Sequence, residues 1–166
     1  EGTDIEFILD LNQAYDLPKA IRFLKEINRF NIKYVEQPLA HDQLEDLEEL
    51  RYHSDIPIAL DESITDIDSI NKILDTNAAD IFILKPQSIG SFQKLNQAIE
   101  LIKNNNKKAV ITSLLEGSIG RFATMHLVAA NQITDTCGLA LEKIYKHEDH
   151  IFPNIKNGTI TISDKP

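Results

Sequence analysis

The sequence predicts an α/β fold in which parallel strands form part of a (β/α) barrel of the TIM type. Strand-like and helix-like segments alternate along nearly the whole chain, and right-handed crossovers between such strands build a parallel sheet. Four strand-like segments stop at a single ionisable residue, and these residues are 26, 25 and 24 positions apart. That period accommodates one strand, one helix and two short loops, so the four residues are expected at the same rim of the sheet.

Six apolar segments have the length of buried strands. They are residues 6–9, 33–35, 56–60, 81–84, 109–112 and 136–141. Helices are expected between them, because Asp16, Asp66 and Ser91 stand where N-cap residues belong and apolar residues follow at helical spacing. These apolar positions are Ile21, Leu24, Ile27, Leu44, Leu47, Leu50, Ile67, Ile70, Ile73, Leu74, Phe92, Leu95, Ile99, Ile102, Phe122, Met125, Leu127 and Val128.

The end of the chain departs from this repeat. Residues 151–155 and 159–162 surround Asn157-Gly158, a strong signal for a two-residue hairpin turn. We therefore divide the chain into a partial barrel domain, residues 1–150, and a C-terminal hairpin tail, residues 151–166.

Two architectures fit alternating strands and helices, an open doubly wound sheet and a barrel. The first strand is not followed by a glycine-rich phosphate loop, which weakens the dinucleotide-binding version of the open sheet. Charged residues at several successive strand ends favour the barrel, whose active site draws on many strand ends. A closed barrel of this type has about eight strands and roughly 250 residues, so six units in 166 residues predict part of a barrel.

Composition narrows the partners. The chain has 17 Lys and Arg against 26 Asp and Glu, a net charge of −9, which argues against nucleic acid or an anionic membrane. No apolar run approaches the roughly 20 residues that span a bilayer. The single Cys137 excludes an internal disulfide and fits a reducing compartment. We expect a soluble cytoplasmic domain that acts on a small molecule.

Three of the strand-end residues, Asp10, Glu36 and Asp61, are acidic. Converging carboxylates repel one another and raise their own pKa values, and a divalent cation that prefers oxygen ligands, such as Mg²⁺, relieves that repulsion. A single acid at a strand end more often caps a helix or contacts solvent. Three in register favour a metal site, and the sequence offers no Cys cluster or His pair for zinc.

The fourth strand-end residue is Lys85, which follows four apolar residues and precedes a proline. A partly desolvated lysine beside a dication has a depressed pKa and can act as a base or as a cation facing an enolate. The simpler interpretation is that Lys85 pairs with one of the acids, and both can hold.

These motifs resemble a known superfamily. Asp10 in Leu-Asp-Leu-Asn, Glu36 in Val-Glu-Gln-Pro, Asp61 in Leu-Asp-Glu-Ser and Lys85 in Leu-Lys-Pro are similar to the barrel motifs of the enolase superfamily, in its muconate-lactonizing subgroup. Residues 113–120, Ser-Leu-Leu-Glu-Gly-Ser-Ile-Gly, resemble the strand-seven motif of o-succinylbenzoate synthases. The resemblance covers nearly the whole chain and implies barrel strands three to eight.

The resemblance implies that Asp10, Glu36 and Asp61 bind Mg²⁺, that Glu62 is a neighbouring acid which orients the site, and that Lys85 faces the substrate. The implied enzyme is a dehydratase, a carbon–oxygen lyase, that acts on a small carboxylate. Removal of the substrate's α-proton gives an enediolate, and loss of hydroxide then gives the aromatic product used for menaquinone. Another lysine would transfer the protons, while Lys85 stabilises the intermediate as a cation.

The chain departs from this family in two ways. The family's second lysine comes from a Lys-x-Lys motif on strand two, but here no lysine precedes Lys19. The N-terminal capping domain and the first barrel strands are also missing. We therefore expect a fragment that is inactive alone and that pairs with another chain through its open sheet edge.

The strand-seven motif offers candidate substrate ligands. Ser113, Glu116 and Gly117 are expected to bind a substrate carboxylate through a hydroxyl and the amides at a helix N-terminus. The alternative for the glycines is a tight turn between strand and helix.

Other functions stay open within the superfamily, namely an N-acylamino acid racemase or a muconate-type cycloisomerase. A dipeptide epimerase fits less well. The resemblance would then imply an Asp-x-Asp motif on strand eight, where this chain has Gly-Leu-Ala-Leu at 138–141. A non-catalytic half-barrel that serves assembly is the alternative of another class.

Overall fold

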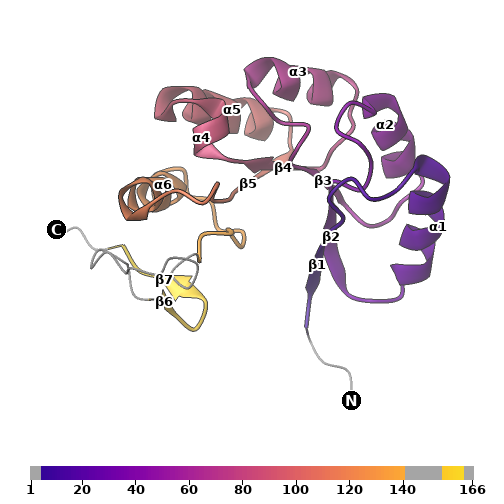
Figure 1. Cartoon of the computed structure of the whole chain (residues 1–166), viewed down its shortest axis with the longest axis horizontal. Coiled ribbons are helices and arrows are strands. Elements are labelled where there is room, and N and C mark those ends of the chain that lie inside the picture. The colour runs from indigo at the N-terminus through magenta and orange to yellow at the C-terminus, as the bar shows by residue number, and fades with distance from the viewer. Residues whose placement is uncertain (1–4, 141–154, 163–166) are drawn as a thin grey trace.

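The computed structural model describes residues 5–140 and 155–162. Its main feature is a five-stranded parallel sheet in which the strands lie side by side in chain order. The strands are β1 (Phe7–Asp10), β2 (Ile32–Glu36), β3 (Ile58–Leu60), β4 (Ile81–Leu84) and β5 (Lys108–Ile111). The sheet curves into half of a barrel, with the helices on its outer side (Figure 1). The predicted α/β half-barrel is confirmed.

The helices cover the outer face of this sheet (Figure 1). They are α1 (Leu17–Ile27), α2 (Leu44–Tyr52), α3 (Ile67–Asp75), α4 (Pro86–Ile89), α5 (Phe92–Asn104) and α6 (Ser118–Ala130). The predicted N-caps are confirmed, because Asp16, Asp66 and Ser91 each accept a hydrogen bond from the backbone amide three residues on. None of the described helices is long and apolar enough to cross a membrane.

The two faces of the sheet carry separate apolar clusters. Between the sheet and the helices lies the larger core, which includes Val35, Leu60, Phe82 and Leu84, all fully buried or nearly so. A smaller cluster lies on the opposite, concave face. Its members alternate with those of the larger core along the strands: Tyr34, Ala59, Ile81, Ile83 and Val110. The concave face is therefore filled like the interior of a barrel.

The prediction of a sixth strand at residues 136–141 is wrong for the part of it that the structure describes. Over its described part, residues 136–140, the segment makes a single parallel bridge between Gly138 and Thr112, together with a hydrogen bond from the Ser113 amide to the Gly138 carbonyl at 3.0 Å. The Leu139 amide instead donates to the Cys137 carbonyl at 3.1 Å, which turns the backbone out of a ladder. Residue 141 lies outside the described residues.

The predicted C-terminal hairpin is confirmed within residues 155–162, and residues 151–154 of its predicted first strand lie outside the described residues. Strands β6 (Ile155–Lys156) and β7 (Thr159–Ile160) pair antiparallel in a sheet of their own. Asn157 and Gly158 both have positive φ, 51° and 72°, as the two central residues of a type I′ turn require.

Candidate functional site at the carboxyl rim of the half-barrel

The four strand-end residues lie at one rim of the sheet. Asp10 and Glu36 are the last residues of β1 and β2, and they are direct partners in the strand register. Asp61 and Lys85 follow β3 and β4 at once. The pairing of β2 with β3 places Asp61 on the same face as Glu36, because Glu36 pairs with Ala59, two residues before Asp61. Side chains alternate with period two, so all three acids share the concave face.

Lys85 lies on the same face of the sheet as the three acids. Ala59 pairs with Ile81 on β4, and Lys85 lies four residues beyond Ile81. The rim residues therefore lie on the same concave face as Ala59, Ile81 and Ile83, whose side chains fill the half-barrel. The structure brings Asp10, Glu36, Asp61 and Lys85 to one face of one rim, as the period predicted.

Lys85 and Asp61 form an ion pair. The Lys85 Nζ lies 2.5 Å from Asp61 Oδ2, and the two side chains are only 24% and 13% exposed. Partial burial strengthens such a pair, because little water competes for either charge. This arrangement agrees with the simpler interpretation of Lys85, namely that it pairs with one of the acids.

The pKa of Glu36 is raised by its position among the other acids. Burial, followed by the charges of Asp10 and Asp61, raises the pKa of Glu36 from 4.5 to about 7, against the opposing effect of Lys85. The charge of Glu62 also raises the pKa of Glu36, by a smaller amount. The expected mutual repulsion of converging carboxylates is thus present at this position.

The donor set suits a hard divalent cation, although the side chains as they lie do not surround a common point. Within residues 5–140 and 155–162, no three His, Cys, Asp or Glu side chains are grouped closely enough to hold a metal. Asp61 turns to Lys85, and Asp10 Oδ1 accepts from the Asn12 amide at 3.0 Å. Three oxygen donors on neighbouring strand ends remain the kind of ligand that Mg²⁺ prefers, and they would have to turn toward one another to bind it.

Glu62 and Thr112 add unsatisfied polar atoms to the described structure. The Oε2 atom of Glu62 and the Oγ1 atom of Thr112 are buried, and neither has a hydrogen-bond partner there. Thr112 follows β5, and its amide donates to the Leu84 carbonyl beside Lys85. A buried oxygen without a donor is costly, so the Glu62 carboxylate fits a site whose charge is completed by a bound cation.

The loop after β5 brings two of the predicted substrate ligands together. Ser113 Oγ donates to Glu116 Oε2 at 2.5 Å, and the Leu114 amide donates to the same oxygen at 2.8 Å. Gly117 is the N-cap of α6 with φ −64°, so its backbone does not require glycine. Gly120 lies inside α6, and a Cβ there would lie 3.0 Å from the Cγ of the flexible Glu116 side chain, which would have to shift by a few tenths of an ångström. Neither Gly117 nor Gly120 has the positive φ of a turn that needs glycine, so the alternative of such a turn is not supported at either residue.

Sequence reasoning missed Gln37, which lies between Glu36 and a proline. Its side chain is fully buried and hydrogen-bonded to residues at the end of β3, including the Asp61 amide at 3.0 Å. A polar residue enclosed between a strand end and Pro38 was the available signal. Its partners are 24 and 26 positions away, at Asp61 and Ser63, and only the folded chain shows them.

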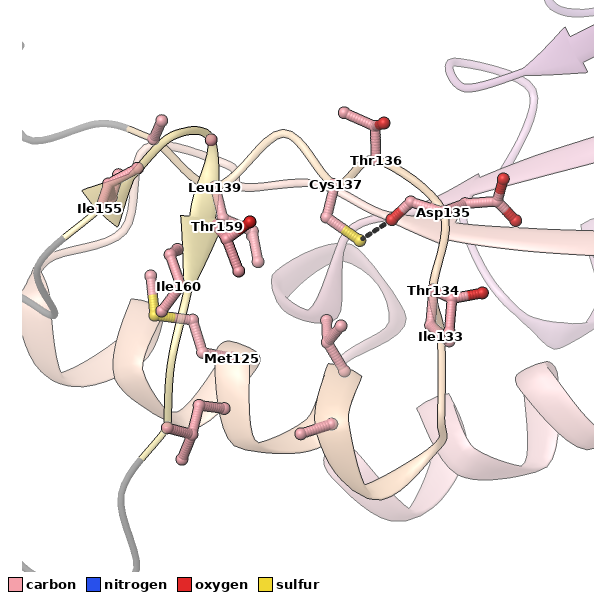
Figure 2. A pocket seen from close by; sticks show the side chains of 15 residues that line it. Met125, Ile133, Thr134, Asp135, Thr136, Cys137, Leu139, Ile155, Thr159 and Ile160 are labelled. Atoms are coloured by element: carbon pink, nitrogen blue, oxygen red, sulfur yellow. Dashed lines mark hydrogen bonds between the residues drawn. The ribbon is translucent and has the colours of Figure 1, made fainter.

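The described structure also contains a cavity away from this rim. It has a volume of about 570 Å³ and lies between α6, residues 133–140 and the hairpin (Figure 2). Met125, Leu139 and Ile160 line it, and Cys137 Sγ donates to the Asp135 carbonyl at 3.5 Å. None of the predicted site residues lines this cavity.

Comparison with known proteins adds a family to this geometry. The family model for enolase C-terminal domain-like proteins matches residues 1–166. An o-succinylbenzoate synthase from Thermobifida fusca is 35% identical over 133 residues, 80% of this chain and 40% of that protein. An N-succinylamino acid racemase from Thermus thermophilus is 29% identical over 140 residues, 84% of this chain and 38% of that protein.

A solved structure agrees over most of the fold. The crystal structure of MenC from Desulfotalea psychrophila matches with a TM-score of 0.86 and 29% identity, over 93% of this chain and 44% of that one. The chain thus spans about two fifths of the length of these relatives.

Proposed function

The chain belongs to the enolase C-terminal domain-like family, and on that premise we propose that it forms part of the barrel of a Mg²⁺-dependent o-succinylbenzoate synthase. The observation that carries the proposal is the common rim of Asp10, Glu36, Asp61 and Lys85. Several relatives named o-succinylbenzoate synthase support the choice of reaction. The proposed setting is menaquinone biosynthesis in the cytoplasm.

The proposed roles follow from position and charge. Asp10, Glu36 and Asp61 would hold Mg²⁺, which supplies positive charge against a substrate carboxylate. Lys85 would turn its ammonium from Asp61 toward the substrate and stabilise the anion left when the α-proton is removed. Glu62 would stay beside the metal ligands and fix their orientation.

Two groups on the neighbouring loop would receive the other end of the substrate. The Ser113 hydroxyl and the backbone amides at the start of α6 lie beyond β5, on the same side of the sheet as the rim. Amides at a helix N-terminus favour an anion, which suits a dicarboxylate substrate. Residues 1–18 contain no lysine, so the proposed reaction would need a proton-transferring lysine from outside these residues.

A racemase is the second candidate. The relative from Thermus thermophilus, 29% identical, is named N-succinylamino acid racemase. The two reactions begin with the same proton abstraction beside a carboxylate. They differ in the fate of the anion, which loses hydroxide in the synthase and is reprotonated in the racemase, where Lys85 would act as the second acid.

The first prediction tests this choice. In a parent chain extended upstream to the length of the relatives, we expect dehydration to o-succinylbenzoate to exceed racemisation of an N-succinylamino acid. Lys85→Ala should lower the dehydration rate at least a hundredfold, because electrostatic stabilisation of the anion is lost. Product formation is followed by absorbance and racemisation by polarimetry.

The matched control is Lys94→Ala, which removes an exposed lysine on α5 and should leave both rates unchanged. Racemisation of equal or greater efficiency would move the assignment to the racemase. Absence of both activities would leave only the fold and the family.

A further inference from the structure

Gln37 holds an unusual position at the rim. It follows Glu36 directly, its side chain is 0% exposed, and its φ is +37° although it is not glycine. A left-handed backbone at such a residue persists only where its surroundings enforce it. The contacts of Gln37 supply that enforcement.

The main chain of Gln37 leaves the ladder at this residue. Its amide still donates to the Ala59 carbonyl at 2.9 Å, as a parallel ladder requires. Its carbonyl, however, accepts from the Gln13 amide at 2.7 Å, in the loop after β1. In a regular parallel ladder that carbonyl would accept from Asp61. The positive φ thus turns the carbonyl away from β3 and toward the β1 loop.

The side chain of Gln37 replaces the lost acceptor. Its Oε1 atom accepts from the Asp61 amide at 3.0 Å and from the Ser63 amide at 3.2 Å. Its Nε2 atom donates to the Leu39 carbonyl at 3.1 Å and to Ser63 Oγ at 3.0 Å. The register between β2 and β3 includes only two residue pairs, so this amide extends the pairing to the residue that carries the third carboxylate.

The same residue therefore contacts the chain beyond all three acidic strand ends. Its backbone is joined to Glu36 and hydrogen-bonded to the loop after Asp10, and its side chain holds the amide of Asp61. Ser63, itself 7% exposed, extends the link by donating to the His41 carbonyl at 3.0 Å. No other side chain in the described structure is shown to hydrogen-bond the Asp61 amide.

We propose that Gln37 is a positioning residue that fixes the backbones of Glu36 and Asp61 so that their carboxylates can converge on one divalent cation. The proposal rests on the metal-dependent function given above. It adds a residue that does not touch the ion, but whose amide sets the direction of two groups that would. Loss of such outer partners lowers metal affinity about ten- to hundredfold in other proteins.

The test uses the full-length parent chain and Mg²⁺ alone as the probe. Gln37→Met keeps the length of the side chain and removes its hydrogen bonds. We expect Mg²⁺ affinity, measured by isothermal titration calorimetry, to fall about tenfold or more. Amide hydrogen exchange in the metal-free protein should show lost protection at Asp61 and Ser63, with Ile83 on β4 unchanged.

Two further variants separate positioning from general destabilisation. Ile73→Ala creates a cavity on α3, where Ile73 is fully buried, and should lower stability without changing Mg²⁺ affinity. Ser63→Ala leaves the Asp61 bond in place, and we expect an affinity loss of about threefold at most. If Gln37→Met does not fold, unchanged affinity and unchanged exchange at Asp61 in Gln37→Asn would overturn the proposal.

Two results would overturn the proposal for Gln37, and a third would contradict the metal assignment. Parental Mg²⁺ affinity in Gln37→Met would overturn the proposal, as would an equal loss in Ile73→Ala. Equal weak binding by the parent and by Asp61→Ala would instead contradict the metal assignment of the proposed function. In that case the exchange at Asp61 alone decides whether Gln37 holds this backbone.

Discussion

At the scale of single residues, the rim stores unfavourable electrostatic energy in Glu36. Burial and two neighbouring carboxylates keep the pKa of this side chain near 7, above its ordinary value of 4.5. The folded state therefore holds a proton that the unfolded chain releases between pH 4.5 and pH 7. Folding stability falls as the pH rises through this window, since ionising Glu36 is harder in the folded state.

The second prediction follows from that sign. In the metal-free chain, Glu36→Gln should abolish this part of the pH dependence, because an amide does not ionise. The variant and the parent should have similar stability near pH 4. Above pH 7 the variant should be more stable by at most about 3 kcal/mol, since each pKa unit corresponds to about 1.4 kcal/mol and Glu36 is partly exposed to screening.

Urea unfolding across this pH range measures the difference. Glu45→Gln, on the exposed side of α2, is the control and should run parallel to the parent. Parallel curves for Glu36→Gln and the parent would mean that Glu36 titrates as an ordinary exposed acid.

At the scale of secondary-structure elements, Asp80 joins a helix and two strands at the end of the sheet opposite the rim. Its Oδ1 atom accepts from Arg51 Nε at 2.7 Å, and Arg51 Nη2 lies 2.6 Å from the same oxygen. Its Oδ2 atom accepts from the Ile58 amide at 3.1 Å. Lys107 lies 3.9 Å away and adds a second positive charge. Arg51 belongs to α2, and Asp80 immediately precedes β4.

The third prediction concerns this junction. Asp80→Ala should lower the free energy of unfolding by about 1–3 kcal/mol, because Arg51 and the Ile58 amide lose a charged acceptor in a partly buried place. Urea unfolding measures the change. The exposed Asp42 supplies the control, since Asp42→Ala should change stability by less than about 0.5 kcal/mol. Equal effects of the two substitutions would assign no structural role to the Asp80 network.

Elements defined by neighbouring residues could be predicted from the sequence. The caps at Asp16, Asp66 and Ser91 depend on a side chain and an amide three positions away. The hairpin turn depends on the left-handed preference of Asn157 and Gly158. The carboxyl rim was predictable for a related reason, because repeating units of equal length bring strand ends into register.

Features that depend on distant partners could not be predicted. The segment at 136–141 has the composition of a strand, yet the bond from the Leu139 amide to Cys137 takes it out of the ladder after one bridge. Gln37 acquires its role from Asp61 and Ser63, which lie on the next unit. Polar contacts of this kind follow from packing geometry, which hydrophobic spacing does not encode.

At the scale of the whole molecule, β1 forms a free edge of the sheet, with β2 as its only partner among the described strands. Apolar side chains near this edge are exposed: Ile5 at 53%, Phe7 at 46% and Ile8 at 38%. An unpaired edge with apolar side chains invites pairing with another chain. We propose that this edge mediates self-association when the chain is isolated.

The fourth prediction tests that edge. Ile8→Lys should weaken self-association of the isolated chain at least tenfold, because a charge on an edge strand opposes further pairing. Sedimentation equilibrium over a range of concentrations measures the dissociation constant. Tyr52→Lys is the matched control, since Tyr52 is 86% exposed on α2, away from the edge. A strictly monomeric parent, or equal association of both variants, would contradict the prediction.

The agreement between strand order and chain order has a consequence for how the protein folds. Each strand pairs with the strand of the unit before it, so the contacts that build the sheet join segments roughly one unit apart. Closing a loop of one unit costs less entropy than closing a longer one, so pairing between successive units is favoured over pairing between distant units. Each unit that leaves the ribosome therefore meets a partner that has already been made. The sheet can grow from β1 to β5 in the direction of synthesis.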